Sequence, residues 1–149
     1  MGCYEISLGD TTGIGSTTDV ETLLEYLSNT VPFDQLACHF HDTYGRAVAN
    51  AIRAYELGIR TFDGSVAGLG GCPFAPGAKG NLATEEIVHV FHQMGVSTGV
   101  NLARLTAVSR WITRTLKRLE RQTPRSGITA SIDHQTPVTS DLVSETAKA

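Results

Sequence analysis

Two histidines separated by one residue, His39 and His41, are the residues of this sequence best suited to chemistry. If they lie on a β-strand, its two-residue period points both imidazoles to the same face. Asp42 follows directly, where such a strand would be ending. Two imidazoles with oxygen ligands nearby favour a divalent-metal site. The alternative is a pair of half-buried strand histidines with ordinary hydrogen-bond partners.

A glycine-rich stretch further along the chain, "GLGGCPFAPGAKGN", runs from Gly68 to Asn81. Cys72 lies there outside any apolar periodic pattern, so it is either a thiol that loop movement brings to a site or an incidental loop cysteine. As a metal ligand, its thiolate would suit zinc. The glycines form neither GxGxxG nor a loop with GK[ST], which favours tight turns over a nucleotide cradle. Asn81 after a glycine fits either a turn or a ligand role.

Three short β-rich segments predict strands, and the candidate groups follow their ends. The predicted strands cover residues 3–8, 35–41 and 59–67. Asp10 follows the first, His41 closes the second, and the glycine-rich stretch follows the third. Active sites of α/β barrels are built at the carboxyl ends of the strands, so this placement favours one shared site. Asp10 could equally start an ordinary turn.

Helices are expected between and after the strands, from apolar spacing and capping residues. Their predicted ranges are about 19–28, 44–57, 85–94 and 102–121. Thr18 with Glu21 predicts a capping box for the first helix, Gly58 a C-terminal glycine for the second, and Thr84 a cap for the third. The predicted buried stripes are Val48, Ala51, Ile52 and Tyr55 in the second helix and Ile87, Val90, Phe91 and Met94 in the third. The basic side chains Arg114, Lys117, Arg118 and Arg121 are expected to form a solvated face of the last helix.

The order β-α-β-α-β-loop-α-α predicts an α/β fold with a parallel sheet. A whole TIM (β/α)8 barrel needs eight units and about 250 residues, whereas this chain has 149 residues. We therefore expect residues 1–122 to form the C-terminal portion of a TIM barrel, about three βα units. Such a part-barrel would expose unpaired strand edges and apolar inner strand faces. Residues 123–149 are rich in Ser and Thr and predict a disordered tail.

The composition bounds the partners and the compartment. A net charge of -3 gives no basic footprint for nucleic acid, and no apolar run approaches the roughly 20 residues that span a membrane. The three cysteines have no CxxC spacing, and the first residues do not resemble a secretory signal. We expect a protein that is not secreted, in a bacterial cytoplasm or a mitochondrial matrix.

Four blocks of the sequence resemble the hydroxymethylglutaryl-CoA lyase family, in the family's order. They are "GCYEISLGDTTGIG", "HFHDTYGRAVAN", "SVAGLGGCPFAPGAKGNLATEE" and "MGVSTGVNL", within about residues 2–102. The resemblance implies a metal-dependent TIM-barrel lyase that cleaves 3-hydroxy-3-methylglutaryl-CoA to acetyl-CoA and acetoacetate, in leucine degradation and ketone-body formation. Isopropylmalate-type synthases and hydroxy-oxo-acid aldolases resemble the chain at HxHD, but the "GLGGCPFAPGA" loop argues against them.

The resemblance also implies roles for single residues. His39, His41 and Asn81 match the ligands of a Mg²⁺ or Mn²⁺ ion. Asp10 matches a catalytic aspartate and Cys72 a reactive loop cysteine, so Asp10 or His39 is the candidate base and Cys72 takes part in proton delivery. The substrate-binding positions would be Asp10, Thr11, Gly70 and Gly71.

One family feature has no counterpart here. The family takes a further metal ligand and an arginine from an Arg-Asp pair on its first barrel strand, and this sequence contains no Arg-Asp dipeptide. We expect an incomplete lyase with little activity alone, acting on an acyl-CoA with a second copy or a complementary N-terminal half as partner. The alternative is a half-barrel that binds metal or CoA without turnover.

Overall fold

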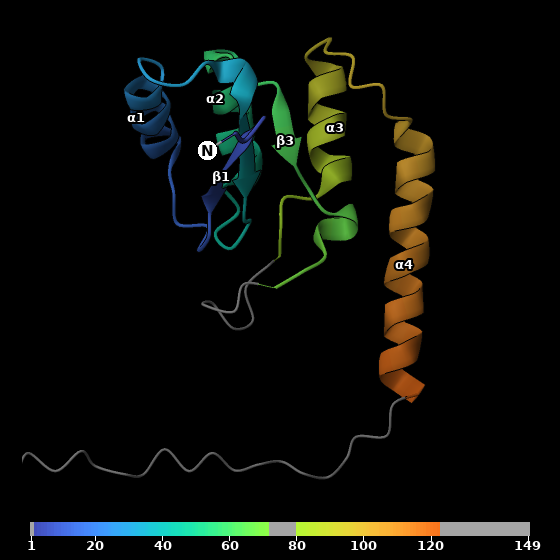
Figure 1. The fold of residues 1–149 in the computed structure, drawn as a ribbon. Helices are drawn as coiled ribbons and strands as arrows, with labels where there is room; N and C mark the ends of the chain where they lie inside the picture. Colours follow the sequence, from blue (N-terminus) through green and yellow to red (C-terminus); the bar gives the residue numbers. More distant parts are fainter. Residues whose placement is uncertain (1, 72–79, 123–149) are drawn as a thin grey trace, which may run out of the picture.

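The computed structural model describes residues 2–71 and 80–122, and it describes side chains up to residue 119. Strands and helices alternate as predicted (Figure 1). In chain order they are β1 (Ile6–Asp10), α1 (Thr17–Leu27), η1 (Phe33–Gln35), β2 (Leu36–Phe40), α2 (Ala47–Leu57), β3 (Thr61–Asp63), η2 (Val66–Gly68), α3 (Thr84–Gln93) and α4 (Leu102–Gln122), where η marks a 3₁₀ turn. The predicted tail, residues 123–149, lies outside the described residues. No helix in the described part of the chain has the length and apolar character needed to cross a membrane.

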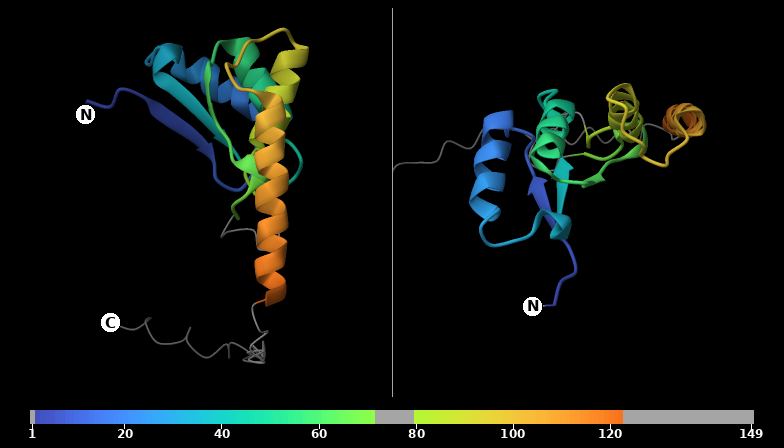
Figure 2. Two further views of the ribbon diagram at one scale, coloured as in Figure 1. Left: turned by 90° about the vertical axis from the view of Figure 1, so that its right-hand side faces the viewer. Right: turned by 90° about the horizontal axis from the view of Figure 1, so that it is seen from above.

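The three strands form one parallel sheet in the order β1-β2-β3. The described helices lie in a row along one side of this sheet (Figure 2). A parallel sheet with helices on one face is the wall of a barrel, whereas a doubly wound sheet carries helices on both faces. The α/β fold and its parallel sheet are therefore as predicted.

The helix-covered face of the sheet is apolar. Leu36, Cys38 and Phe40 of β2 are 1%, 2% and 4% exposed and belong to the core that the helices close. Their neighbours in register are Leu8 on β1 and Phe62 on β3, both packed against this core. The predicted alternation of β2, with Cys38 and Phe40 on one side and His39 on the other, is confirmed.

The opposite face of the sheet is small and polar. Two cross-strand rows line it, Ser7–Ala37–Thr61 and Gly9–His39–Asp63. The prediction that a part-barrel would expose apolar inner faces is therefore wrong for these strands. Because period-two alternation places the large apolar side chains of β2 under the helices, only small or polar side chains remain for the open face.

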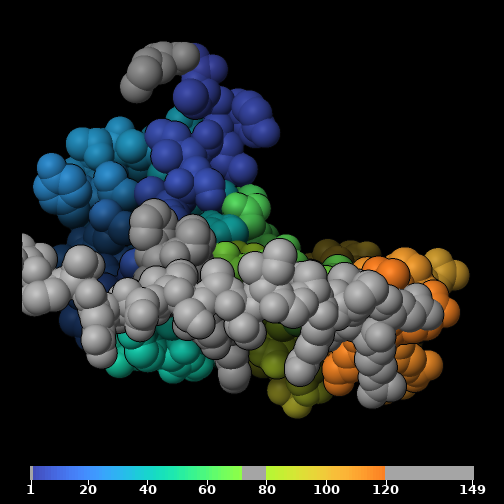
Figure 3. Space-filling model, turned by 90° about the horizontal axis from the view of Figure 1, so that it is seen from below, coloured from blue at the N-terminus to red at the C-terminus, as the bar shows by residue number. Residues whose placement is uncertain are grey.

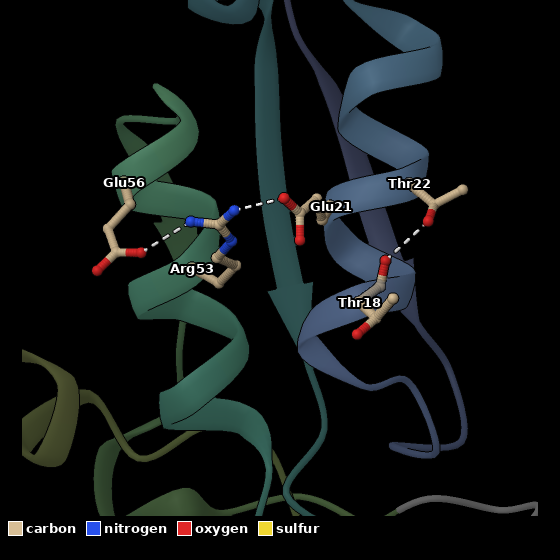
Figure 4. A network of polar contacts seen from close by, with 5 residues as sticks. All are labelled: Thr18, Glu21, Thr22, Arg53 and Glu56. Atoms are coloured by element: carbon tan, nitrogen blue, oxygen red, sulfur yellow. Dashed lines mark hydrogen bonds and ion pairs between the residues drawn. The ribbon is translucent and has the colours of Figure 1, made fainter.

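Helix α1 begins earlier than predicted. Ser16 is its N-cap, and Ser16 and Asp19 form the capping box in place of Thr18 and Glu21. Glu21 instead accepts a 2.5 Å ion pair from Arg53 of α2, which also binds Glu56 at 3.1 Å (Figure 4). An aspartate three residues after the cap serves the same function as the glutamate of the usual pattern. Glu21 is therefore not needed for the cap, and its ion pair with Arg53 connects α1 to α2.

Helix α2 begins later than predicted, at Ala47. Gly45 has a φ of 69°, outside the helical region, and Asp42 caps the helix by accepting the N–H of Ala47 at 3.1 Å. The buried residues are Ala47, Asn50, Ala51 and Ala54, so of the predicted stripe Ala51 is confirmed as buried. Val48 and Tyr55 are only partly buried against the core. Three alanines on this face let the helix pack closely on the sheet. Gly58 ends the helix with a φ of 121°, as predicted.

Strand β3 is shorter than predicted, and the predicted cap of α3 is wrong. The chain leaves the sheet after Asp63, and Ser65 pairs with Ala83, so that the N–H of Thr84 donates to the Ser65 carbonyl at 3.0 Å. Thr84 is thus the first residue of α3, and the N-cap Ala83 makes no side-chain cap. The buried residues are Ile87, Val88 and Phe91, whereas the predicted Met94 is 41% exposed.

Helix α4 lies at the end of the molecule opposite α1, as the view from below shows (Figure 3). None of its described side chains is buried. Its apolar residues Val108 and Leu119 are about half exposed. The predicted solvated basic face is confirmed for Arg114, Lys117 and Arg118, and the Arg121 side chain lies outside the described residues.

Candidate metal and active site

The two histidines and Asn81 meet at the carboxyl end of β2. His39 is on the strand, and His41 follows it and forms an isolated antiparallel bridge with Asn81. Backbone hydrogen bonds on either side hold this bridge, from Leu82 N to Phe40 O and from Asp42 N to Gly80 O, both 3.0 Å. The two imidazole centroids are 5.1 Å apart. The three residues that the sequence analysis set apart as ligands therefore come together.

Hydrogen bonds leave a ligand atom available on two of these side chains. The Nδ1 of His41 is 3.0 Å from the carbonyl oxygen of Asp10. A carbonyl only accepts, so Nδ1 carries the hydrogen and Nε2 keeps its lone pair. Asn81 donates from Nδ2 to the Leu69 carbonyl at 2.9 Å, which leaves Oδ1 as an acceptor. This is the hydrogen-bond pattern that supports metal-binding imidazoles, so both residues fit a metal ion.

Other candidate ligands are engaged elsewhere or lie outside the described residues. The Asp42 carboxylate caps α2. Among residues 2–71 and 80–122, no three His, Cys, Asp or Glu side chains form a group that could hold a metal. The third predicted ligand is the amide oxygen of Asn81, which is not one of these four residue types. Cys72, and with it the zinc alternative, lies outside the described residues.

Asp10 ends β1 and holds the loop that follows it. Its two carboxylate oxygens accept the N–H groups of Gly13 and Gly15 at 3.0 and 3.1 Å. Arg46 and Asn50 add bonds to the carbonyls of Ile14 and Gly15, at 2.8 and 3.0 Å. Gly13 has a φ of 70°, and a Cβ there would lie 2.7 Å from Thr43 Oγ1. The loop is therefore tightly held, and the roles of Asp10 as base and of Thr11 in substrate binding stay predictions.

Ala67, directly before the glycine-rich stretch, has a strained backbone and is held by a side chain. Ala67 has a φ of 59°, a left-handed conformation that is uncommon for alanine. Its N–H donates to both oxygens of Glu85, at 3.1 and 3.0 Å, and Ser109 of α4 donates to the same carboxylate at 2.5 Å. Glu85 therefore joins η2 to α3 and α4. Sequence reasoning placed Glu85 only at a helix N-terminus, because nothing local marks its long-range partners.

Gly70 has a local reason to be glycine. Its φ is 112°, and a Cβ at this position would lie 2.5 Å from the Nδ2 atom of Asn81. The residue thus makes room for a predicted ligand. Substrate binding by Gly70 and Gly71 stays a prediction.

Asp63 is a site residue that the sequence analysis missed. It lies beside His39 in register, with Oδ2 3.9 Å from His39 Nδ1, and it accepts a 3.1 Å hydrogen bond from Ser7 Oγ. Asp63 is the last residue of β3, and a strand end is a signal that sequence reasoning can use. The predicted strand covered residues 59–67, so it placed Asp63 in the middle of a strand.

The chain is similar to hydroxymethylglutaryl-CoA lyases in sequence and in fold. The mitochondrial hydroxymethylglutaryl-CoA lyase of Arabidopsis thaliana is 52% identical over 118 residues, which are 79% of this chain and 25% of that protein. The crystal structure of the Bacillus subtilis HMG-CoA lyase has 49% identity and a TM-score of 0.76, covering 78% of this chain and 39% of that one. An Acinetobacter baumannii HMG-CoA lyase, solved with coenzyme A and 3-methylmalate, has 34% identity and a TM-score of 0.72, covering 90% and 44%.

These relatives are much longer than this chain, which spans between a quarter and less than half of their lengths. The HMGL-like family model matches residues 1–112, the N-terminal part of this chain. It includes every candidate site residue named above. Since the model matches well over half of the residues, the chain belongs to the HMGL-like family.

Proposed function

We propose that this chain is part of a hydroxymethylglutaryl-CoA lyase, which cleaves 3-hydroxy-3-methylglutaryl-CoA to acetyl-CoA and acetoacetate. The observation that carries the proposal is the meeting of His39, His41 and Asn81 at one strand end, with Nδ1 of His41 and Nδ2 of Asn81 already bonded to carbonyls. Identity of about half to lyases from a plant and a bacterium supports it. The bound coenzyme A in the Acinetobacter relative supports an acyl-CoA substrate.

The residues of the chain would divide the chemistry among them. His39, His41 and Asn81 would hold a divalent ion, Mg²⁺ or Mn²⁺, which supplies Lewis-acid polarisation of the substrate hydroxyl when bound. Asp10 would remove the hydroxyl proton, so that the C2–C3 bond breaks as the alkoxide becomes a ketone. His39 is the candidate base only if its lone pair does not bind the ion. Cys72 would deliver a proton to the departing acetyl-CoA enolate. Leucine degradation and ketone-body formation follow as the setting, in a bacterial cytoplasm or a mitochondrial matrix.

Binding of Mn²⁺ to the 149-residue chain tests the ligand set. Free Mn²⁺ measured by electron paramagnetic resonance should fall on addition of the chain. The variants His41→Ala and Asn81→Ala should each weaken binding by at least tenfold, because each removes one ligand. His89→Ala is the matched control, since His89 is an exposed histidine of α3. The ligand set is wrong if both site variants bind Mn²⁺ as the control does.

Acetoacetate release tests the activity. The chain alone with Mn²⁺ is expected to show little turnover, because it has no Arg-Asp pair. Supplementing it with the remaining N-terminal segment of the Bacillus subtilis lyase should restore turnover, and Cys72→Ser in this chain should lower it. Turnover by the chain alone at ordinary enzyme rates, above about 1 per second, would contradict the expected need for a partner. Metal binding with no turnover in the supplemented mixture would favour the non-catalytic half-barrel.

A further inference from the structure

The two histidines of the site have different neighbours at Nδ1. His41 is fixed from the backbone, by the carbonyl of Asp10 at 3.0 Å. His39 instead faces a side chain, the carboxylate of Asp63, with 3.9 Å between Nδ1 and Oδ2. A carboxylate and a backbone carbonyl are the two usual partners of the second ring nitrogen in a metal-binding histidine. His41 therefore has a backbone partner at hydrogen-bond distance, whereas the carboxylate beside His39 lies 3.9 Å from Nδ1, beyond that distance.

The sheet register is what brings Asp63 to His39. The two residues are paired across β2 and β3, and Gly9 is the partner of His39 on β1. A glycine leaves the β1 side of His39 without a side chain, so the ring has space on that side and a carboxylate on the other. Both polar residues are partly exposed, with side-chain exposures of 35% for His39 and 53% for Asp63.

Ser7 determines where the Asp63 carboxylate lies. Its hydroxyl donates to Asp63 Oδ2 at 3.1 Å, across the width of the sheet from β1 to β3. Ser7 lies in the next row of the same face, so the three side chains form a connected polar group, Ser7–Asp63–His39. The oxygen that accepts from Ser7 is the one nearest to His39. At 3.9 Å the two side chains are in ion-pair range and not hydrogen-bonded, so the proposed role requires them to approach by about 1 Å.

We propose that Asp63, held by Ser7, is a positioning residue that fixes the tautomer and orientation of His39, so that Nε2 faces the ligand. This inference rests on the proposed function, in which His39 holds a divalent ion. Asp63 would accept a hydrogen bond from Nδ1–H, and the hydrogen on Nδ1 leaves the lone pair on Nε2. Asp63 itself would contact neither metal nor substrate.

The tautomer of His39 provides a test that needs neither metal nor activity. Nitrogen-15 chemical shifts of the imidazoles, recorded on the metal-free chain at a pH where they are neutral, should show His39 in the Nδ1–H form. Asp63→Ala should move His39 toward a mixture of tautomers and leave His41 unchanged, because His41 is fixed by a backbone carbonyl. Asp63→Asn keeps an acceptor oxygen and should retain part of the effect. Unchanged His39 shifts in Asp63→Ala would overturn the inference.

Mn²⁺ affinity is the second readout. Loss of a hydrogen-bond partner of a metal-binding histidine lowers metal affinity by about 10–100-fold, which is the range expected for Asp63→Ala, with a smaller loss for Ser7→Ala. Asp34→Asn is the control, because it removes an exposed carboxylate from η1, at the other end of β2.

The two readouts separate this inference from the proposed function. Normal Mn²⁺ affinity in Asp63→Ala together with lost affinity in His39→Ala would overturn the positioning role and keep the ligand set. Normal affinity in His39→Ala would refute the ligand role of His39, and the nitrogen-15 shifts would still decide whether Asp63 positions the ring. Circular dichroism of each variant should show an intact fold, because the substituted side chains are exposed or partly exposed.

Discussion

The two faces of the sheet use the same three strands in different ways. Under the helices, β2 presents Leu36, Cys38 and Phe40, all nearly inaccessible to solvent. On the open face it presents His39 between Gly9 and Asp63. Apolar burial contributes roughly 25 cal/mol per Å² to stability, so the covered face supplies the folding energy. The open face contributes little to stability, which leaves its side chains available for chemistry.

The largest expected effect is the loss of stability on truncating a side chain of the covered face. Leu36→Ala should lower the free energy of unfolding by about 2–5 kcal/mol, because it removes a fully buried side chain and leaves a cavity. His39→Ala on the open face should change it by less than about 0.5 kcal/mol. Urea unfolding followed by circular dichroism measures both values. Equal losses in the two variants would show that the two faces contribute equally to stability, against this comparison.

The second largest expected effect is a loss of folding stability at alkaline pH, through the Cys38 thiol of the covered face. Burial, and secondarily the charge of Asp63, raises the pKa of the Cys38 thiol to about 11 from 9.0. Because the folded-state pKa is the higher one, the stabilisation is complete below about pH 9 and is lost as the pH rises toward 11, by up to about 3 kcal/mol. Unfolding measured from pH 8 to 11 should show this fall in the wild type. Cys38→Ala is the control, and an equally steep fall in that variant would assign the loss to other groups.

Asp10 lies where the strand meets its loop, so its removal should have an intermediate effect. Asp10→Ala leaves the N–H groups of Gly13 and Gly15 without their carboxylate acceptor, at a cost of about 1–3 kcal/mol. Amide hydrogen exchange at these two glycines should accelerate, whereas exchange in α2 should change only with global stability. Unaltered exchange at both glycines would show that other contacts hold the loop.

The smallest expected effect is a gain in stability on relieving the backbone strain at Ala67. Ala67→Gly should stabilise the chain by about 1 kcal/mol, since a left-handed φ costs roughly that much for a residue with a Cβ. Ala49→Gly is the matched control on the exposed side of α2, where the same change should destabilise by about the same amount. Thermal unfolding distinguishes them, and a loss of stability in both variants would contradict strain at Ala67.

The order of elements and the place of His39 and His41 at a strand end were predictable, because strand periodicity and strand ends are local signals. Asn81 was predicted as a ligand from the family resemblance. The cap of α1 and the start of α2 were not predictable, since Ser16 with Asp19 and Thr18 with Glu21 both match the local capping-box pattern. In the structure Ser16 and Asp19 form the box, and Glu21 pairs with Arg53 of another helix. Asp63 and the long-range partners of Glu85 depend on register and on helix placement, which one sequence does not reveal.

The bridge between His41 and Asn81 has a consequence for folding. These residues are far apart in the chain, and α2, β3 and η2 lie between them. Bringing them together costs loop-closure entropy, and that cost grows only slowly with the length of chain enclosed. A ligand held by both residues would bind only after this loop has closed, so it would favour the folded chain in proportion to the logarithm of its concentration. The bridge therefore connects occupancy of the site to the folding equilibrium of the chain.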